Sequence, residues 1–208
     1  MRALPNRKIY SPADGVTAAA LAAISFEDPA PQYLRFDRAG IPDLYEGQDV
    51  DFRQGLVPVR SGKDVCIIAC GVMVHQAIEI AQQLQREGID AGVVDLFRIK
   101  PLNAEWLLDE LAGVSHVVTM EEHLLAGGMG SCILELLANH GLTRPVLRRG
   151  QNDRFSFERG GREVIWKDSG LDVASMVPRI QHWLSSCSRQ QCCVPADGSS
   201  STARKITS

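Results

Sequence analysis

The 208-residue sequence has no apolar run that approaches the roughly 20 residues needed to cross a bilayer. Its first ten residues also lack the apolar core of a signal peptide. The sequence also lacks an excess of positive charge: it contains 22 Lys and Arg and 25 Asp and Glu, which gives a net charge of −3. This balance argues against a nucleic-acid-binding surface. We therefore expect a cytoplasmic protein that binds neither membranes nor nucleic acid.

The six cysteines contain no C-x-x-C pair, and no histidine spacing supports a zinc site. They divide into an internal set within apolar stretches and a set in the C-terminal tail: Cys66, Cys70 and Cys132, then Cys187, Cys192 and Cys193. A free thiol in an apolar stretch behaves as a small hydrophobe. In a reducing cytosol all six should be thiols, and we expect no metal site.

From residue 63 onward, strand and helix patterns alternate along the chain. Strand patterns at 65–69, 91–96, 117–120 and 145–147 alternate with helix patterns at 74–84, after Asn103, after Ser131 and at 171–184. The first strand is nearly all apolar, as expected when both faces of a sheet are covered. This order predicts an α/β fold, with a mostly parallel sheet and helices on both faces.

Three helix details can be predicted from individual residues. Asn103 is the expected N-cap of its helix. In the helix after Ser131, the spacing places Ile133, Leu134 and Leu137 on one apolar face. Pro178 lies inside the last helix pattern, so it should kink that helix or shift its start toward Ser175.

The flanking segments differ in composition from this regular region. Residues 1–40 contain strand, helix and strand patterns at 8–10, 15–24 and 32–36, which cannot close a core alone and need neighbours that the chain does not contain. Residues 41–62, rich in Gly and Pro, predict a linker to the main domain at 63–184. Residues 185–208 are serine-rich with few apolar anchors and predict a disordered tail.

The stretch VVTMEEHLLAGGMGSCILELL, residues 117–137, is the one around which the rest of the chain is arranged: a strand, a polar tip, a glycine-rich turn and a helix. An exposed loop is expected at Glu121, Glu122 and His123, with carboxylates that accept hydrogen bonds from nearby backbone N–H groups. The glycines that follow, Gly127, Gly128 and Gly130, match neither the dinucleotide fingerprint nor the nucleotide-triphosphate loop. We expect them to permit close packing of a helix on the sheet or on a second subunit.

Several motifs occur in the order found in transketolase-like enzymes. DVCIIACGVMVHQAIEIAQQLQREGIDAGVVDLFRIKPL resembles the opening of their C-terminal domain, VVTMEEHLLAGGMGSCILELL its glycine-rich signature, and GLDVASMVPRI its closing helix. MRALPN, YSPADGVTAAALAAI and YLRFDR are similar to the last part of the preceding pyrimidine-binding domain. The resemblance thus implies a remnant of that domain at 1–40. Deoxyxylulose-phosphate synthase and the beta subunit of 2-oxo acid dehydrogenases have similar C-terminal domains and stay open as alternatives.

The resemblance implies part of a thiamine-diphosphate enzyme that transfers two-carbon ketol units between sugar phosphates. In this family the cofactor and its Mg²⁺ lie between two subunits. The G-D-G tripeptide of the metal motif does not occur here, and the family's activating glutamate belongs before MRALPN. We therefore expect no cofactor on this chain alone, and as partners a second copy and a thiamine-diphosphate-binding subunit. The alternative is a non-catalytic dimerisation or docking module.

The resemblance also points to two substrate-binding residues. Arg38 occupies the place of the arginine that contacts the substrate phosphate in the family, and Arg35 is a second candidate. Arginine suits this role because its planar fork can bind a phosphate through two hydrogen bonds. The alternative is that both side chains are only solvated at the end of a strand.

Overall fold

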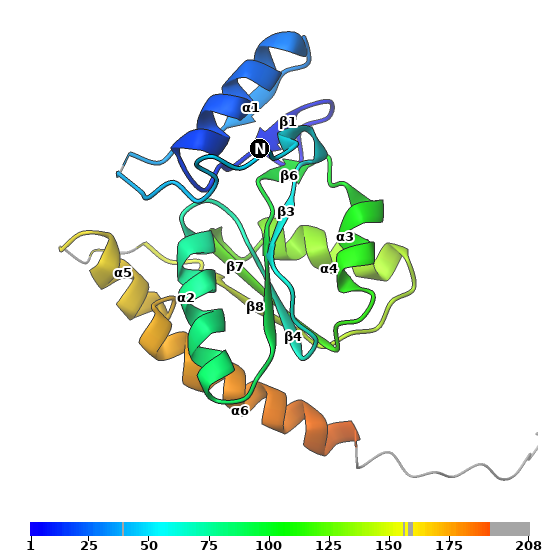
Figure 1. The fold of residues 1–208 in the computed structure, drawn as a ribbon, viewed down its shortest axis with the longest axis vertical. Coiled ribbons are helices and arrows are strands. Elements are labelled where there is room, and N and C mark those ends of the chain that lie inside the picture. Colours follow the sequence, from blue (N-terminus) through cyan, green and yellow to red (C-terminus); the bar gives the residue numbers. More distant parts are fainter. Residues whose placement is uncertain (39, 156, 158–159, 192–208) are drawn as a thin grey trace, which may run out of the picture.

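The computed structural model describes residues 1–38, 40–155, 157 and 160–191. Its helices and strands follow one another in this order (Figure 1): β1 (Lys8–Tyr10), α1 (Gly15–Glu27), β2 (Gln32–Leu34), the 3-10 turn η1 (Phe52–Gln54), β3 (Val57–Arg60), β4 (Val65–Ala69), α2 (Met73–Arg86), β5 (Ala91–Asp95), β6 (Arg98–Lys100), α3 (Ala104–Leu111), β7 (His116–Leu124), α4 (Met129–Asn139), β8 (Val146–Gln151), α5 (Arg162–Ser169) and α6 (Val173–Gln191). Among the described helices, none combines the length and apolar character of a bilayer span.

The larger sheet has the strand order β3-β5-β4-β7-β8. Its strands are parallel except for β3, which runs antiparallel to β5. Side chains on β4 alternate between two apolar clusters: Ile67 packs with α2 and α6, whereas Ile68 packs with α3 and α4. Figure 1 shows the two helix pairs on opposite sides of the sheet. The predicted α/β fold with helices on both faces is confirmed.

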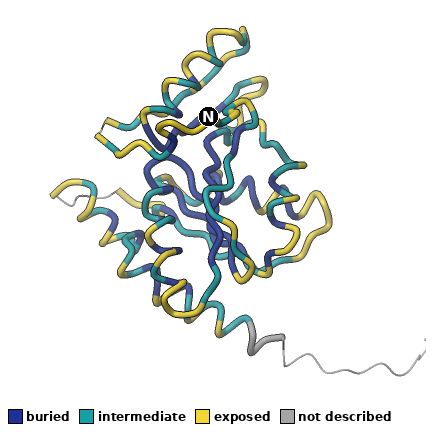
Figure 2. The backbone as a smooth tube through the Cα atoms, viewed as in Figure 1, coloured by how far each residue is buried: buried dark blue, intermediate teal, exposed yellow. Residues whose placement is uncertain are grey.

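The N-terminal strands form a second, smaller sheet with the order β2-β1-β6. The strand β1 is parallel to β2 and antiparallel to β6. Residues 1–40 were expected to need neighbours from outside the chain, but the chain itself supplies β6. The helix α1 is only lightly covered, since Thr17 and Leu21 are its buried residues. Figure 2 shows this contrast between the buried larger sheet and the exposed α1.

The structure differs from the sequence-based expectations at several element boundaries. The expected linker at 41–62 contains β3, which joins the larger sheet. The expected loop at Glu121, Glu122 and His123 is part of β7, which continues to Leu124. Residues 185–191 are helical, although a disordered tail was expected from 185. The remainder of that tail, including Cys192 and Cys193, lies outside the described residues.

The predicted helix details have mixed outcomes. The side chain of Asn103 accepts a hydrogen bond from the N–H of Trp106 at 3.4 Å, which confirms the N-cap. Leu134 is 39% exposed while Ile133 is buried, so the expected apolar face of α4 was too wide. The helix α6 starts before Ser175, because Asp172 accepts a hydrogen bond from the Ser175 N–H at 3.1 Å.

Candidate functional site

The candidate site is a hollow at the carboxyl ends of β4 and β7, where ligands bind in many parallel α/β sheets. Its volume is about 130 Å³. Residues 35–38, which follow β2, form one wall, and residues 70–72, which follow β4, form another. The lining is completed by Ser11, Pro12, Glu122 of β7 and Arg162 of α5. Separate parts of the chain therefore bring their polar side chains to one place.

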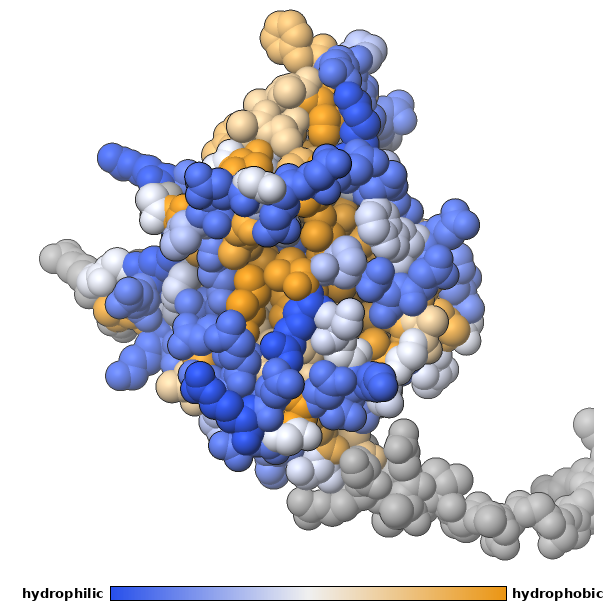
Figure 3. Space-filling model, in the orientation of Figure 1, coloured by the Kyte–Doolittle hydropathy of each residue, from blue (hydrophilic) through white to orange (hydrophobic). Residues whose placement is uncertain are grey.

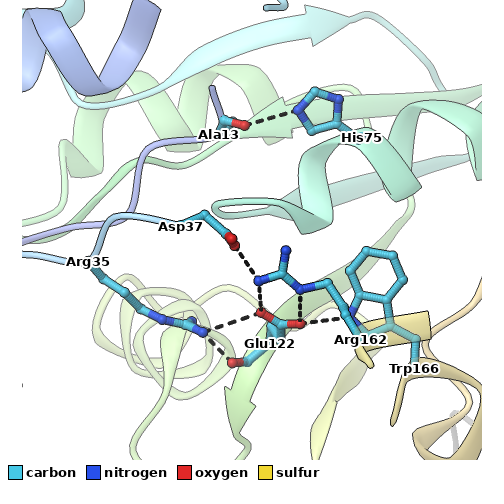
Figure 4. A network of polar contacts seen from close by, with 7 residues as sticks. All are labelled: Ala13, Arg35, Asp37, His75, Glu122, Arg162 and Trp166. Atoms are coloured by element: carbon cyan, nitrogen blue, oxygen red, sulfur yellow. Dashed lines mark hydrogen bonds and ion pairs between the residues drawn. The ribbon is translucent and has the colours of Figure 1, made fainter. Parts of the chain in front are cut away.

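Glu122 lies at the centre of a charged network in this hollow (Figure 4). Its carboxylate accepts hydrogen bonds from Arg162 Nε at 2.9 Å, from Trp166 Nε1 at 2.8 Å and from Arg35 Nη2 at 3.3 Å. Its backbone oxygen accepts a second bond from Arg35, at 3.1 Å. Asp37 accepts from Arg162 Nη2 at 2.5 Å. The network joins the segment after β2 to α5.

Arg38 lines the same hollow but stands outside this network. Its side chain is exposed. Within the described part of the chain, no hydrogen bond or ion pair engages it. Arg35, by contrast, is already paired with Glu122. The two arginines suggested by the sequence therefore line one hollow. Arg35 is paired with a carboxylate, and Arg38 has no such partner among the described residues.

Glu121 fills the N-terminus of α4. Its carboxylate accepts hydrogen bonds from the N–H groups of Met129 at 2.7 Å and Gly130 at 2.9 Å, and its side chain is buried. Burial raises the pKa of the Glu121 carboxyl, and the two N–H bonds oppose that rise. A helix N-terminus attracts anions, and at α4 the Glu121 carboxylate is the anion that accepts its N–H groups.

The glycine-rich turn packs tightly around that carboxylate. A Cβ atom at Gly128 would lie 2.1 Å from Glu121 Oε2, and one at Gly130 would lie 2.6 Å from Thr119 Oγ1. Gly127 has a φ of 70°, which lets the chain turn into α4. His123 is exposed, and its Nδ1 lies 3.1 Å from the backbone oxygen of Leu124. The glycines here leave room for a side chain rather than for a nucleotide.

A separate buried cluster joins the N-terminal region to the larger sheet. Asp14 accepts from the N–H of Thr17 at 2.7 Å and of Leu44 at 2.7 Å. It also accepts from the N–H of Tyr45, whose hydroxyl donates to Asp95 at 2.9 Å. Burial raises the pKa of Asp95 to about 8. Tyr45 thus links two buried carboxyl groups from distant parts of the chain.

Comparison with known proteins identifies the family. Residues 55–176 match the family described as "Transketolase, C-terminal domain", which covers more than half of the chain. The chain belongs to this family. Its transketolase C-terminal domain corresponds to the larger sheet and the helices that cover it, from β3 to the start of α6.

Relatives of this transketolase C-terminal domain are longer than the chain. 1-Deoxy-D-xylulose-5-phosphate synthase of Caldanaerobacter subterraneus is 37% identical over 182 residues, which are 86% of this chain and 29% of the synthase. An apulose-4-phosphate transketolase subunit of Actinobacillus succinogenes is 29% identical over 178 residues, which are 85% of this chain and 57% of that relative. A solved structure, "Split gene transketolase, inactive beta4 tetramer", matches with a TM-score of 0.81 and 35% identity over 89% of this chain and 60% of that one.

The described residues do not fit the cofactor that the family resemblance implies. The sequence contains no G-D-G tripeptide. Within the described ranges, no group of three or more His, Cys, Asp or Glu side chains could hold a metal ion. The N-terminus of α4, which could otherwise cradle a diphosphate, is filled by Glu121. We therefore assign no step of cofactor chemistry to this chain.

Sequence reasoning missed three residues of the site: Asp37, Arg162 and Trp166. Asp37 and Arg162 are 125 residues apart, and α5 was not among the predicted helices. The signal that could have located α5 is short: a glycine pair at 160–161 followed by REVIW, with Ile165 and Trp166 as its larger apolar residues. The contacts themselves depend on the tertiary fold.

Proposed function

We propose that this chain is the C-terminal portion of a thiamine-diphosphate-dependent transketolase-type enzyme that moves two-carbon ketol units between sugar phosphates. The family membership and the split-gene relative support the type of enzyme. The chain provides a phosphate-binding side chain and a docking scaffold, and partner chains supply the cofactor and its Mg²⁺. Its buried free thiols, such as Cys66 and Cys70, suit a reducing cytoplasm.

The position of Arg38 in the hollow is the observation that supports this proposal most directly. It lines the hollow at the carboxyl ends of the strands and keeps an unpaired guanidinium group among the described residues. A guanidinium group binds a phosphate dianion through charge-assisted, bidentate hydrogen bonds. In this proposal Arg38 holds the phosphate end of the sugar, and Arg35 contributes less because Glu122 already neutralises it.

The partners proposed are a second copy of this chain and a chain that binds thiamine diphosphate. The relatives named above include one subunit of an apulose-4-phosphate transketolase and a "beta4 tetramer" of a split-gene transketolase. This chain spans 57% and 60% of their lengths, so each contains further sequence that has no counterpart here. Exposed apolar residues on the N-terminal region, including Phe26 at 96% and Phe36 at 53%, offer a surface for assembly.

The test mixes this chain with a co-encoded chain that carries the G-D-G motif and the activating glutamate. Turnover of sugar phosphates should require both chains, and the Arg38→Ala variant should lose about 10- to 150-fold in kcat/KM. Arg38→Lys should recover only part of this loss, because a point charge cannot reproduce the fork. A ketose substrate without phosphate is the control, and wild type and Arg38→Ala should use it almost equally.

Three outcomes would contradict this proposal. Equal impairment of Arg38→Ala on both substrates would mean that Arg38 supports the fold instead of the substrate. Micromolar binding of thiamine diphosphate to the chain alone, measured by calorimetry, would contradict the need for a partner. Turnover with pyruvate as the two-carbon donor would indicate the reaction of deoxyxylulose-phosphate synthase or a 2-oxo acid dehydrogenase instead.

The second candidate function is a non-catalytic dimerisation or docking module. The observation in its favour is α1, an apolar helix with two buried residues and a largely exposed surface, visible as an apolar area at the top of Figure 3. This function predicts a stable complex with the partner chain and no change in that chain's activity. Turnover that depends on Arg38 would exclude it.

A further inference from the structure

Among the described residues, three arginines and two carboxylates line the hollow, and they are unequally paired. Arg162 is bound by both Asp37 and Glu122, and Arg35 is bound by Glu122. The Glu122 side chain is 15% exposed, whereas that of Arg35 is 41% exposed. Arg38, the third arginine, has neither carboxylate as a partner among the interactions of the described residues. Among these five side chains, both carboxylates are therefore paired with arginines, and Arg38 is the arginine that keeps an uncompensated positive charge.

The donors around Glu122 are the kind that bind phosphate in other sites. Arg35 and Arg162 present guanidinium groups and Trp166 an indole N–H, and all three point at the two oxygens of one carboxylate (Figure 4). The guanidinium of Arg162 also stacks over the Trp166 ring, 5.8 Å from its centroid. Such a cluster of donors would recruit a second anionic group if the carboxylate were absent.

The pairing of the charges limits what the hollow can bind with Glu122 in place. Among the described residues that line it, Arg38 is the arginine without a carboxylate partner, because Arg35 and Arg162 are both paired. One cation suits one phosphate group, whereas two adjacent phosphate groups need a second cation. The carboxylate occupies the place where that second group would meet Arg35.

We propose that Glu122 is an internal anion that restricts this hollow to a single phosphate group by neutralising Arg35 and leaving Arg38 as the free cation. This inference rests on the proposed function for the role of Arg38. It adds a specificity rule: the site accepts the phosphate end of a monophosphate and disfavours ligands with two adjacent phosphates. Removing the charge of Glu122 should leave Arg35 without a carboxylate partner, although its hydrogen bond to the Glu122 backbone oxygen remains. Arg162, by contrast, keeps Asp37 as a partner.

The test titrates the full chain with inorganic phosphate and, separately, with pyrophosphate at fixed ionic strength. Calorimetry and phosphorus NMR measure the binding. Wild type should not prefer pyrophosphate by more than about 3-fold. Glu122→Gln retains an oxygen that can accept the Trp166 N–H but loses the charge. This variant should bind pyrophosphate at least about 10-fold more tightly than wild type, because a charge-assisted contact to Arg35 is gained.

Matched variants separate this effect from a general change in charge. Glu163→Gln removes the same charge one residue from Arg162, at an exposed position, and should leave both affinities within about 2-fold of wild type. The double variant Glu122→Gln with Arg35→Gln should lose the gain. A gain of equal size in Glu163→Gln, or no gain in Glu122→Gln, would overturn the inference.

Two further measurements keep the outcomes distinct. If Glu122→Gln does not fold, the wild-type comparison still decides, because a strong preference for pyrophosphate would contradict the rule. Arg38→Gln tests the underlying assignment separately, since it should abolish phosphate binding. If Arg38→Gln binds phosphate like wild type, the proposed role of Arg38 fails. If it loses binding but Glu122→Gln gains nothing, only the specificity rule fails.

Discussion

Helices α1 and α2 are close in length, at 13 and 14 residues, but they are covered to very different extents. The helix α2 buries six residues, among them Ile80 and Leu84, and turns its polar residues to solvent. The helix α1 buries Thr17 and Leu21, although its sequence is the more apolar of the two. A helix that is apolar on all sides is normally buried. The chain itself therefore covers the apolar face of α2, whereas it leaves most of the apolar surface of α1 exposed.

The largest expected effect comes from one substitution made in both helices. Leu84→Ala removes a fully buried side chain from the larger core and should lower the free energy of unfolding by about 2–5 kcal/mol. Leu21 is also fully buried, but Leu21→Ala should cost less, because its cluster with Tyr10 and Phe97 is much smaller than the one around Leu84. Urea unfolding followed by tryptophan fluorescence measures the larger domain alone, since all three tryptophans, Trp106, Trp166 and Trp183, lie there.

Equal shifts of the fluorescence midpoint in Leu84→Ala and Leu21→Ala would contradict the expected difference between the two helices. They would mean that α1 and α2 belong to one cooperative unit. The circular-dichroism signal of all helices provides the control, because Leu21→Ala should change its early part and leave the fluorescence transition in place.

The second prediction concerns pH and the boundary between the two regions, where Asp95 is fully buried. Its pKa is about 8 in the folded chain, against an ordinary value of about 3.9 in the unfolded chain. Between these values the folded state holds a proton that the unfolded state has lost. The contribution of Asp95 to stability is therefore greatest below about pH 4 and falls by up to about 1.4 kcal/mol per pH unit as the pH rises to 8.

The Asp95→Asn variant should remove this slope and be more stable than wild type at pH 8. Urea unfolding of both proteins at a series of pH values measures the difference and cancels contributions from other groups. Tyr45→Phe removes the hydroxyl donor but keeps the carboxyl, so it should lower stability and retain the slope. Parallel curves for wild type and Asp95→Asn would contradict the assignment.

A smaller effect is expected at Asp14, which caps α1 and also holds residues 44–45. Asp14→Ala should cost about 1–2 kcal/mol, a typical loss for an N-cap, and should speed hydrogen exchange in α1 more than in α2. Asp14→Asn should restore the cap, because its carbonyl oxygen can accept from Thr17. It should restore neither bond from residues 44–45, because both end on Oδ2 of Asp14 and the amide nitrogen in its place is a donor. Unchanged exchange in Asp14→Ala would contradict this prediction.

The smallest effect on stability is expected at Phe26, which is 96% exposed. Phe26→Ser should change the free energy of unfolding by less than about 0.5 kcal/mol. It should nevertheless reduce the self-association of the chain, measured by sedimentation at several concentrations, because it removes apolar surface from α1. Glu79→Ser, at an exposed position of α2, should leave association unchanged. A monomeric wild type at high concentration would contradict the expected dimer.

The elements that sequence could predict are those with a strong local pattern. The apolar run at β4, the periodic residues of α2 and the N-cap Asn103 all carry their signal within a few residues. Strands β3 and β6 are short, and β3 contains Pro58 while β6 is followed by Pro101. Their assignment therefore depends on pairing with β5 and β1. Such pairing is a tertiary property that no local pattern records.

The candidate site shows the same division. Arg38 could be placed from its motif, because a resemblance transfers a position along the chain. Glu122 could be identified as a polar residue after an apolar strand, but its partners could not. Arg162 and Trp166 come from α5, forty residues or more away in sequence, and only the folded chain brings them together. The role of Glu122 as an internal anion therefore had no signature in the sequence.

The smaller sheet includes β6, which lies far along the chain from β1 and β2. This arrangement has a consequence for the order in which the two sheets fold. Ile9 of β1 pairs with Lys100 of β6, and β3, β4, α2 and β5 all lie between the two along the chain. Closing so long a loop costs entropy, which the packing of the larger sheet must first offset. We therefore expect the residues that leave the ribosome earlier to complete their sheet later, after the domain that follows them has folded.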